Sequence, residues 1–246
     1  MKTLLLVVSL FGVAFCGGLN GRVVGGLDAH EGQFPHQVSL RLKGSHNCGG
    51  SIISSRYILT AAHCVYMSGN EAYPAQYFSI RAGSTERLQG GVLRNVVKVI
   101  MHENYSQSNF DVALLELDLP LIFSNNIQAI PLATEEVPAG EKVIISGWGR
   151  LWTGGDIPYK LQWNTLISLS KNQCFRKILQ SSDGLLCLDH ASDNGACNGD
   201  SGGPAIYNGQ LVGVANFVVV KCGSDRPDGY AKVSYHLDWI KKNAQF

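Results

Sequence analysis

Short runs in which apolar and polar residues alternate recur along most of the chain. Residues 36–43 alternate in this way, which would place Val38, Leu40 and Leu42 on one buried face of a strand. Residues 142–146 and 210–214 read as similar strands, and glycine-rich turns separate such segments. The pattern predicts an all-β protein, built as a sandwich or as barrels.

Only the C-terminal tail has the periodicity of a helix. Residues 233–243 place Val233, Leu237 and Ile240 on one face, and two lysines stand near the end of the segment. Cations are favourable there because the C-terminal end of a helix carries partial negative charge. We therefore expect one α-helix, at the end of the chain.

The N-terminal segment has the composition of a signal peptide. A lysine precedes about a dozen apolar residues, which are too few to span a bilayer. Ala14 and Cys16 supply the small residues expected before a signal-peptidase cut, so residues 1–16 are predicted to be removed. The protein is then secreted and extracellular.

Cleavage after residue 16 would remove one of the seven cysteines. An even number in a secreted chain predicts disulfides, although spacing alone leaves many pairings open. A zinc site is the alternative, but the cysteines lack paired Cys-x-x-Cys spacing. The six remaining cysteines are Cys48, Cys64, Cys174, Cys187, Cys197 and Cys222.

Size and charge narrow the class of partner. A second cut after Arg22 would leave 224 of the 246 residues, enough for one domain or two small ones. The 20 basic residues would fall to 18, against 19 acidic residues. Such a chain has no basic field for nucleic acid and no further apolar segment that could span a membrane. We expect neutral substrates such as extended peptides.

Three motifs carry candidate chemistry. Residues 199–204 read Gly-Asp-Ser-Gly-Gly-Pro, a turn that could expose the hydroxyl of Ser201. A serine is a weak nucleophile unless a base takes its proton and a third group orients that base. His63 stands beside a cysteine at the end of one apolar run, and Asp111 is a lone carboxylate at the start of another. Each residue alone could be structural, whereas together they predict a nucleophile, its base and the group that orients the base.

In the order His, Asp, Ser, these motifs resemble the trypsin/chymotrypsin family of serine endopeptidases, and the resemblance runs from Val23 to the C-terminus. It implies a protease domain over residues 23–246, made of two packed six-stranded β-barrels with a boundary near residue 130 and a C-terminal α-helix. The substrate cleft would lie between the barrels. The oxyanion of the reaction would be held by the backbone N–H groups of Gly199 and Ser201.

Residues 22–26, Arg-Val-Val-Gly-Gly, resemble the activation site of this family. The resemblance implies an activation propeptide over residues 17–22. A cut after Arg22 would free an α-ammonium on Val23 that pairs with the carboxylate of Asp200. The protein would therefore be made as a zymogen and activated by a separate trypsin-like protease.

The resemblance also selects one disulfide pattern, Cys48 with Cys64, Cys174 with Cys187, and Cys197 with Cys222. Asn104 begins a single glycosylation sequon, Asn-Tyr-Ser. Residues 83–86 lack the acid that follows the glycine in calcium-binding members, so we expect neither a metal nor a cofactor. We expect a monomer that protein inhibitors could bind.

The pocket residues depart from those of trypsin. Gly195 and Ala196 stand where trypsins carry an acid at the pocket base, which favours apolar side chains. Asp228 aligns with a second pocket position and would instead favour lysine or arginine if its carboxylate enters the pocket; Pro-Asp-Gly is otherwise an ordinary turn. The pocket wall is expected to consist of Asn216, Phe217 and Val218.

Two of these wall residues carry specific expectations. Val218 should narrow the mouth of the pocket and exclude the largest aromatic side chains. Asn216 replaces a serine that in the family hydrogen-bonds the catalytic carboxylate. An apolar or broad specificity is therefore predicted, with trypsin-like specificity as the alternative. Two alternatives to an active protease remain. One is a catalytically inactive homologue that acts as a binding protein, and the other is a toxin or adhesion module.

Overall fold

The computed structural model describes residues 23–69, 71–106 and 109–244 of the 246. The predicted signal peptide, the predicted propeptide and Arg22 lie outside the described residues. Among the described residues, neither α-helix has the length and apolar character needed to cross a membrane.

Six antiparallel strands close the first barrel, in the spatial order β2-β3-β4-β9-β8-β7. Their bounds are β2 Gln37–Leu42, β3 Ser45–Ile52, β4 Tyr57–Thr60, β7 Phe78–Ala82, β8 Val92–Met101 and β9 Ala113–Leu117. A small hairpin lies beside them, made of β5 (Tyr66–Ser68) and β6 (Glu71–Ala72). Two 3₁₀ turns complete this half, Ala62–Cys64 and Ala75–Tyr77.

The second barrel is formed by the C-terminal half of the chain. Its strands are β10 Lys142–Gly147, β11 Gln162–Ser168, β12 Leu185–Asp189, β13 Pro204–Tyr207, β14 Gln210–Phe217 and β15 Asp228–Lys232. They follow the order β11-β10-β13-β14-β15-β12, and pairing of β12 with β11 closes the ring. The N-terminal strand β1 (Leu27–Asp28) adds to the edge of β11. The prediction of two six-stranded barrels is confirmed.

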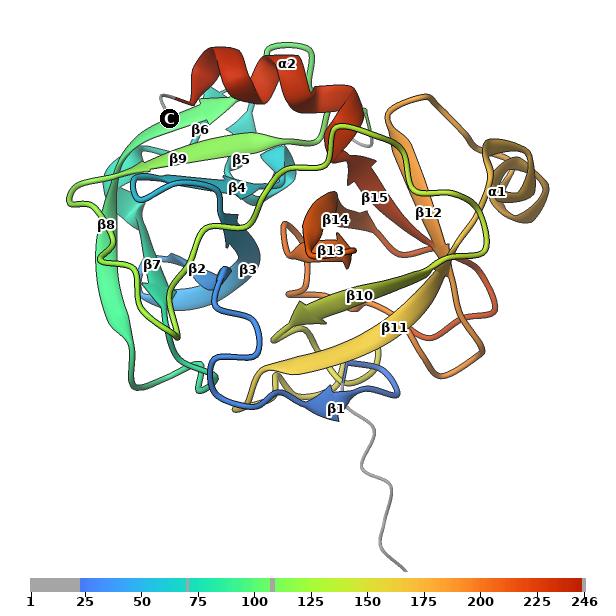
Figure 1. Ribbon diagram of the computed structural model, residues 1–246, viewed down its shortest axis with the longest axis horizontal. Helices are drawn as coiled ribbons and strands as arrows, with labels where there is room; N and C mark the ends of the chain where they lie inside the picture. Colours follow the sequence, from blue (N-terminus) through green and yellow to red (C-terminus); the bar gives the residue numbers. More distant parts are fainter. Residues whose placement is uncertain (1–22, 70, 107–108, 245–246) are drawn as a thin grey trace, which may run out of the picture.

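The two barrels lie side by side, and the C-terminal helix α2 (Val233–Asn243) crosses the top of the first barrel in the view of Figure 1. The chain thus leaves the second barrel and returns to the first. Val233, Trp239 and Ile240 are buried in the same apolar cluster as the first-barrel strands. The helix therefore ties the two halves together.

Strand β2 has the predicted alternation of apolar and polar residues, but both of its faces contain buried residues. Val38 and Leu40 are fully buried in the first-barrel core, as expected. Gln37 and Ser39, on the polar face, are also buried. This face points toward the second barrel, where Ser146 Oγ donates a hydrogen bond to Gln37 Oε1 at 2.7 Å. Polar residues can be buried at such a junction because they find partners there.

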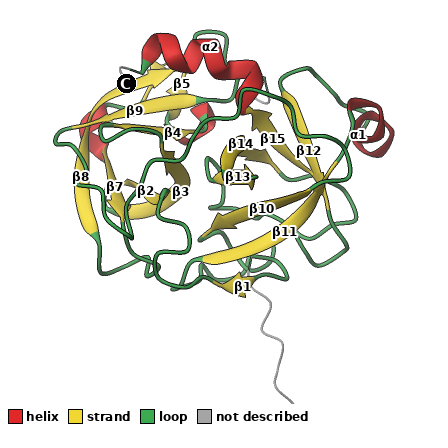
Figure 2. Cartoon of the chain, viewed as in Figure 1, coloured by secondary structure: helices red, strands yellow, loops and turns green. Residues whose placement is uncertain are grey.

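The expectation that only the tail is helical was wrong. A second helix, α1, spans Lys171–Ile178 and projects from the second barrel (Figure 2). Its N-terminus is a capping box: Gln173 N–H donates to Ser170 Oγ, and Ser170 N–H donates to Gln173 Oε1 at 2.8 Å. This Ser-x-x-Gln pair is visible in the sequence and was the signal for a helix.

Three disulfides join Cys48 to Cys64, Cys174 to Cys187, and Cys197 to Cys222. These are the pairs that the resemblance implied. The first ties the 3₁₀ turn that carries His63 to β3, and the second ties α1 to β12. Each bridge limits the freedom of the unfolded chain and typically contributes about 2–4 kcal/mol.

Candidate active site

His63 and Asp111 form a directly bonded pair in the first barrel. His63 lies in the 3₁₀ turn after β4, and Asp111 lies just before β9. The carboxylate of Asp111 is fully buried and accepts two hydrogen bonds from His63, from the backbone N–H at 2.8 Å and from Nδ1 at 2.7 Å. Because the proton on Nδ1 is donated to Asp111, the other ring nitrogen, Nε2, is free to accept a proton.

Ser201 lies in the turn before β13 of the second barrel. Gly199 and Gly202, on either side of it, have φ values of +101° and +75°, which residues with a side chain rarely adopt. A Cβ on Gly202 would lie 2.2 Å from Thr60 Oγ1 of β4, so the turn approaches the first barrel too closely for any larger residue.

Backbone contacts between the barrels fix this turn. Gly49 N–H, on β3, donates to the Ser201 carbonyl at 2.8 Å. A Cβ on Gly49 would lie 2.8 Å from the Cα of Gly203, so glycine allows the two barrels to meet here. The contact places the serine turn of one barrel against the histidine-bearing half of the other.

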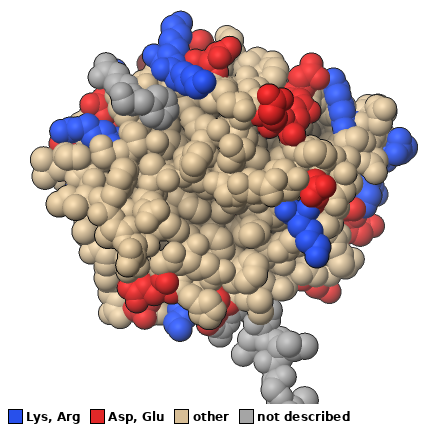
Figure 3. All heavy atoms as spheres, in the orientation of Figure 1, with Lys and Arg blue, Asp and Glu red and all other residues tan. Residues whose placement is uncertain are grey.

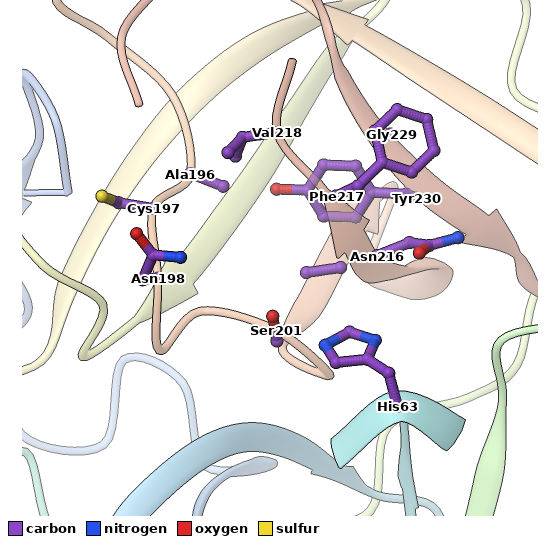
Figure 4. Close-up of a pocket in the computed structure, with 11 residues that line it drawn as sticks. His63, Ala196, Cys197, Asn198, Ser201, Asn216, Phe217, Val218, Gly229 and Tyr230 are labelled. Atoms are coloured by element: carbon purple, nitrogen blue, oxygen red, sulfur yellow. The ribbon is translucent and has the colours of Figure 1, made fainter. Parts of the chain in front are cut away.

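His63 and Ser201 share the rim of a cavity of about 370 Å³. Figure 4 shows the two side chains next to each other, with the cavity opening beyond Ser201. The residues that line it are His63, Ala196, Cys197, Asn198, Ser201, Ala215, Asn216, Phe217, Val218, Gly229 and Tyr230. Four of the expected pocket residues are thus in the lining: Ala196, Asn216, Phe217 and Val218. Asn198 and Tyr230 were not singled out from the sequence.

Asp228 lies behind the cavity lining. Its side chain is buried, and Oδ2 accepts a hydrogen bond from the backbone N–H of Ala196 at 2.6 Å. Burial raises the pKa of this carboxyl group. The reading of Asp228 as an outward-pointing turn residue was wrong, because the residue begins β15, where register pairs it with Leu188 of β12.

His190 meets Asp228 at the base of the pocket. Its Nε2 lies 3.3 Å from Asp228 Oδ2, and its side chain is also buried. Gly195 permits this contact, because a Cβ there would lie within 2.6 Å of both Asp228 Oδ2 and His190 Nε2. His190 could not be singled out from the sequence, because its contact with Asp228 depends on the pairing of β12 with β15.

The pocket wall is formed by the end of β14. Phe217 packs over Gly229, where a Cβ would lie 2.4 Å from the ring. Val218 is partly buried against the Cys197–Cys222 disulfide and lines the cavity. Asn216 also lines the cavity.

Asp200 is buried beneath the serine turn. Its carboxylate accepts hydrogen bonds from Gly149 N–H at 2.7 Å and Cys197 N–H at 2.9 Å. Burial nevertheless raises the pKa of Asp200 to about 6. The Val23 side chain is fully buried in the apolar cluster of the second barrel. Val24 pairs with Gly195, which fixes the start of the described chain against the pocket base.

One group of potential metal ligands lies close together within the described part of the chain, formed by Cys48, His63 and Cys64. The two cysteines are bonded to each other, so their thiolates are not available to a metal. The proximity reflects the disulfide that holds the His63 turn. The zinc reading of the cysteines has no support in these three residues.

Comparisons with known proteins agree with this geometry. The family described as Trypsin matches residues 23–240. Serine protease SP24D of Anopheles gambiae is 52% identical over 220 residues, covering 89% of this chain and 80% of that protein. Trypsin alpha of Drosophila melanogaster is 38% identical over 233 residues, covering 92% and 89%.

A solved structure has the same fold. Neuropsin, a serine protease expressed in the limbic system of mouse brain, superimposes with a TM-score of 0.79 at 28% identity, covering 88% of this chain and 97% of its own. With a bonded histidine–aspartate pair and a serine on one cavity, two closed barrels and these relatives, the chain belongs to the trypsin family of serine proteases and is a serine endopeptidase.

Proposed function

We propose that the protein is secreted as a zymogen and hydrolyses peptide bonds through Ser201, His63 and Asp111, with a preference for apolar side chains before the cut. The observation that carries the catalytic part is the His63–Asp111 pair on the rim of the cavity that Ser201 also lines. The buried, partnered state of Asp228 carries the apolar part.

The reaction proceeds by acyl transfer. Ser201 Oγ bonds to the scissile carbonyl carbon while His63 Nε2 takes the hydroxyl proton, and the carbonyl oxygen gains the electron pair of its π bond. The carbon–nitrogen bond then breaks, and His63 returns the proton to the leaving amine. Water repeats both steps and frees Ser201. Asp111 keeps His63 in the required tautomer and stabilises the imidazolium.

The backbone N–H groups of Gly199 and Ser201 are proposed to bind the oxyanion. The positive φ of Gly199 supports this role, because it turns the local peptide in a way that a glycine permits. Such a donor is worth about 3–4 kcal/mol to the transition state. No side-chain charge is needed for this step.

Activation is proposed to follow a cut after Arg22, made by a separate trypsin-like protease. The freed α-ammonium of Val23 would pair with Asp200, whose carboxylate is buried with two N–H donors and no cation among the described residues. A buried ion pair that loses one partner typically costs about 3–5 kcal/mol, so the pairing can drive a conformational change. Uncut Arg22→Gln protein should be inactive, and full activity of that protein would exclude this route.

Secretion and surface features are proposed on related grounds. Residues 1–16 would act as the signal peptide, and three disulfides suit an oxidising compartment. Asn104 is exposed and is the candidate glycosylation site. On the face shown in Figure 3, basic and acidic side chains are interspersed, which favours no nucleic-acid partner at this face. The protein is proposed to act as a monomer.

Primary specificity is tested by kcat/KM on matched peptides that differ only in the residue before the cut: Leu, Phe, Ala, Arg or Lys. Leucine should lead at about pH 7, and phenylalanine should follow because Val218 narrows the cavity. Arginine ahead of leucine by more than about tenfold, or 1.4 kcal/mol, would show that Asp228 governs the pocket as a free charge.

A further inference from the structure

The pair formed by His190 and Asp228 closes the base of the substrate cavity. Two of the cavity-lining residues, Ala196 and Gly229, are in direct contact with Asp228: Ala196 donates its N–H to Oδ2, and Gly229 follows Asp228 in β15. The side chains of His190 and Asp228 are only 2% and 3% exposed. A substrate side chain that fills the cavity therefore meets lining residues that are backed directly by Asp228.

Hydrogen-bonding partners fix the protons of the pair. His190 Nδ1 lies 3.0 Å from the carbonyl oxygen of Ala191. A carbonyl only accepts, so Nδ1 carries a proton. Nε2 then lies 3.3 Å from a carboxylate oxygen and has no hydrogen-bond partner among the described residues, and a further proton on Nε2 is favoured by the negative charge of that carboxylate. The Ala196 N–H favours the ionised carboxylate, so this proton belongs on His190. The pair is then an imidazolium and a carboxylate with no net charge.

Surrounding groups favour retention of that proton. Burial alone would lower the pKa of His190, but Asp228, the Ala191 carbonyl and the nearby Asp189 outweigh it and raise the pKa above its usual value. Asp189 in turn is bound by Lys177 of α1 at 2.7 Å. The remaining titratable groups that interact with Asp228 are Asp200 and Tyr230, both buried, and its negative charge raises the pKa of each.

We propose that His190 is a positioning residue for substrate selection, which holds and neutralises Asp228 so that a proton on the pair competes with a cationic substrate side chain. This inference rests on the proposed apolar specificity and names the residue that produces it. With the proton in place the pocket base is neutral and accepts apolar side chains. Without it the base carries one negative charge and favours lysine or arginine.

The direction of the pH dependence follows from the charge. The preference for arginine over leucine should rise with pH by up to about tenfold per pH unit while the pair still holds its proton, and level off once the proton is lost. Any pH effect on the catalytic step that is common to both substrates cancels in the ratio. Tight binding of a cation should also release a proton, because the proton and the cation exclude each other.

The test measures the ratio of kcat/KM for matched arginine and leucine peptides between about pH 6 and pH 9, per active site titrated with a serine-directed phosphonate. The wild-type ratio should rise with pH. In His190→Gln the proton can be held only by the Asp228 carboxyl group, so the ratio should rise at a lower pH than in wild type. In Asp228→Asn it should stay low throughout. His36→Gln, which alters another buried histidine far along the chain, should follow the wild-type profile.

A second readout needs no variant. Calorimetric titration of the activated wild-type protein with benzamidine, in buffers of different ionisation enthalpy, should detect release of close to one proton near neutral pH. A pH-independent wild-type ratio, or a His190→Gln profile that matches wild type, overturns the role of His190. Arginine leading leucine at every pH would instead overturn the proposed apolar specificity, so the two failures are distinct.

Discussion

The buried Asp200 makes the uncut protein sensitive to pH in a way that can be measured. The residue is 4% exposed, and among the described residues its carboxylate has two hydrogen-bond donors, the backbone N–H groups of Gly149 and Cys197. Burial raises its pKa from 3.8 to about 6. A change of this size corresponds to about 3 kcal/mol against the ionised form in the folded state.

The sign follows from the two pKa values. The folded pKa lies above the unfolded one, so the folded state binds the proton more tightly. The stabilisation of the folded state by the proton on Asp200 is fully present below about pH 3.8 and is lost as the pH rises through about 6. Replacing Asp200 by asparagine in the uncut chain should therefore stabilise it at neutral pH, by about 3 kcal/mol more than at acid pH.

Urea unfolding measures this effect with the disulfides intact. Both proteins carry Arg22→Gln, to prevent activation, and Ser201→Ala, to prevent self-digestion; one also carries Asp200→Asn. The difference in unfolding free energy between them should change by about 3 kcal/mol between about pH 3.5 and pH 7.5. A difference that stays constant within about 0.5 kcal/mol would refute the burial argument.

Three further predictions concern single residues. Asp111→Asn should lower kcat by about ten-thousand-fold with the fold intact, because the amide favours the wrong His63 tautomer; steady-state kinetics and circular dichroism check this. Val218→Gly should raise kcat/KM for phenylalanine relative to leucine by about tenfold, since it widens the cavity, and an unchanged ratio would show that Val218 does not limit access. Ser170→Ala should cost about 1 kcal/mol of stability in urea unfolding through loss of the α1 cap, while kcat/KM stays as in wild type.

The sequence predicted those parts of the structure that depend on local pattern. Alternation located β2 and β10, and helical spacing located α2 with the bounds that the structure has. The shorter helix α1 was missed because eight residues give little periodicity, although Ser170 and Gln173 carried the capping signal. The burial of Ser39 was not predictable either, because it depends on a second barrel packing against β2.

The residues of the candidate site also differ in whether local sequence pattern could predict them. His63, Asp111 and Ser201 could be singled out because each stands in a recognisable motif. His190 could not, because it lies 38 residues before Asp228 in the sequence and comes next to it only through the register of β12 against β15. The state of Asp228 was therefore open until the fold was known. The charge at the pocket base depends on the buried residues that contact Asp228.

Labelling of Ser201 tests the central claim most directly. After a cut between Arg22 and Val23, a serine-directed phosphonate should label one site per molecule, at Ser201, because only an activated serine reacts stoichiometrically. Ser201→Ala should abolish the label, and both Ser201→Ala and His63→Ala should lower kcat by about a million-fold. A cut, folded protein that takes up no label at Ser201, or variants that keep more than about a hundredth of the wild-type rate, would contradict the account.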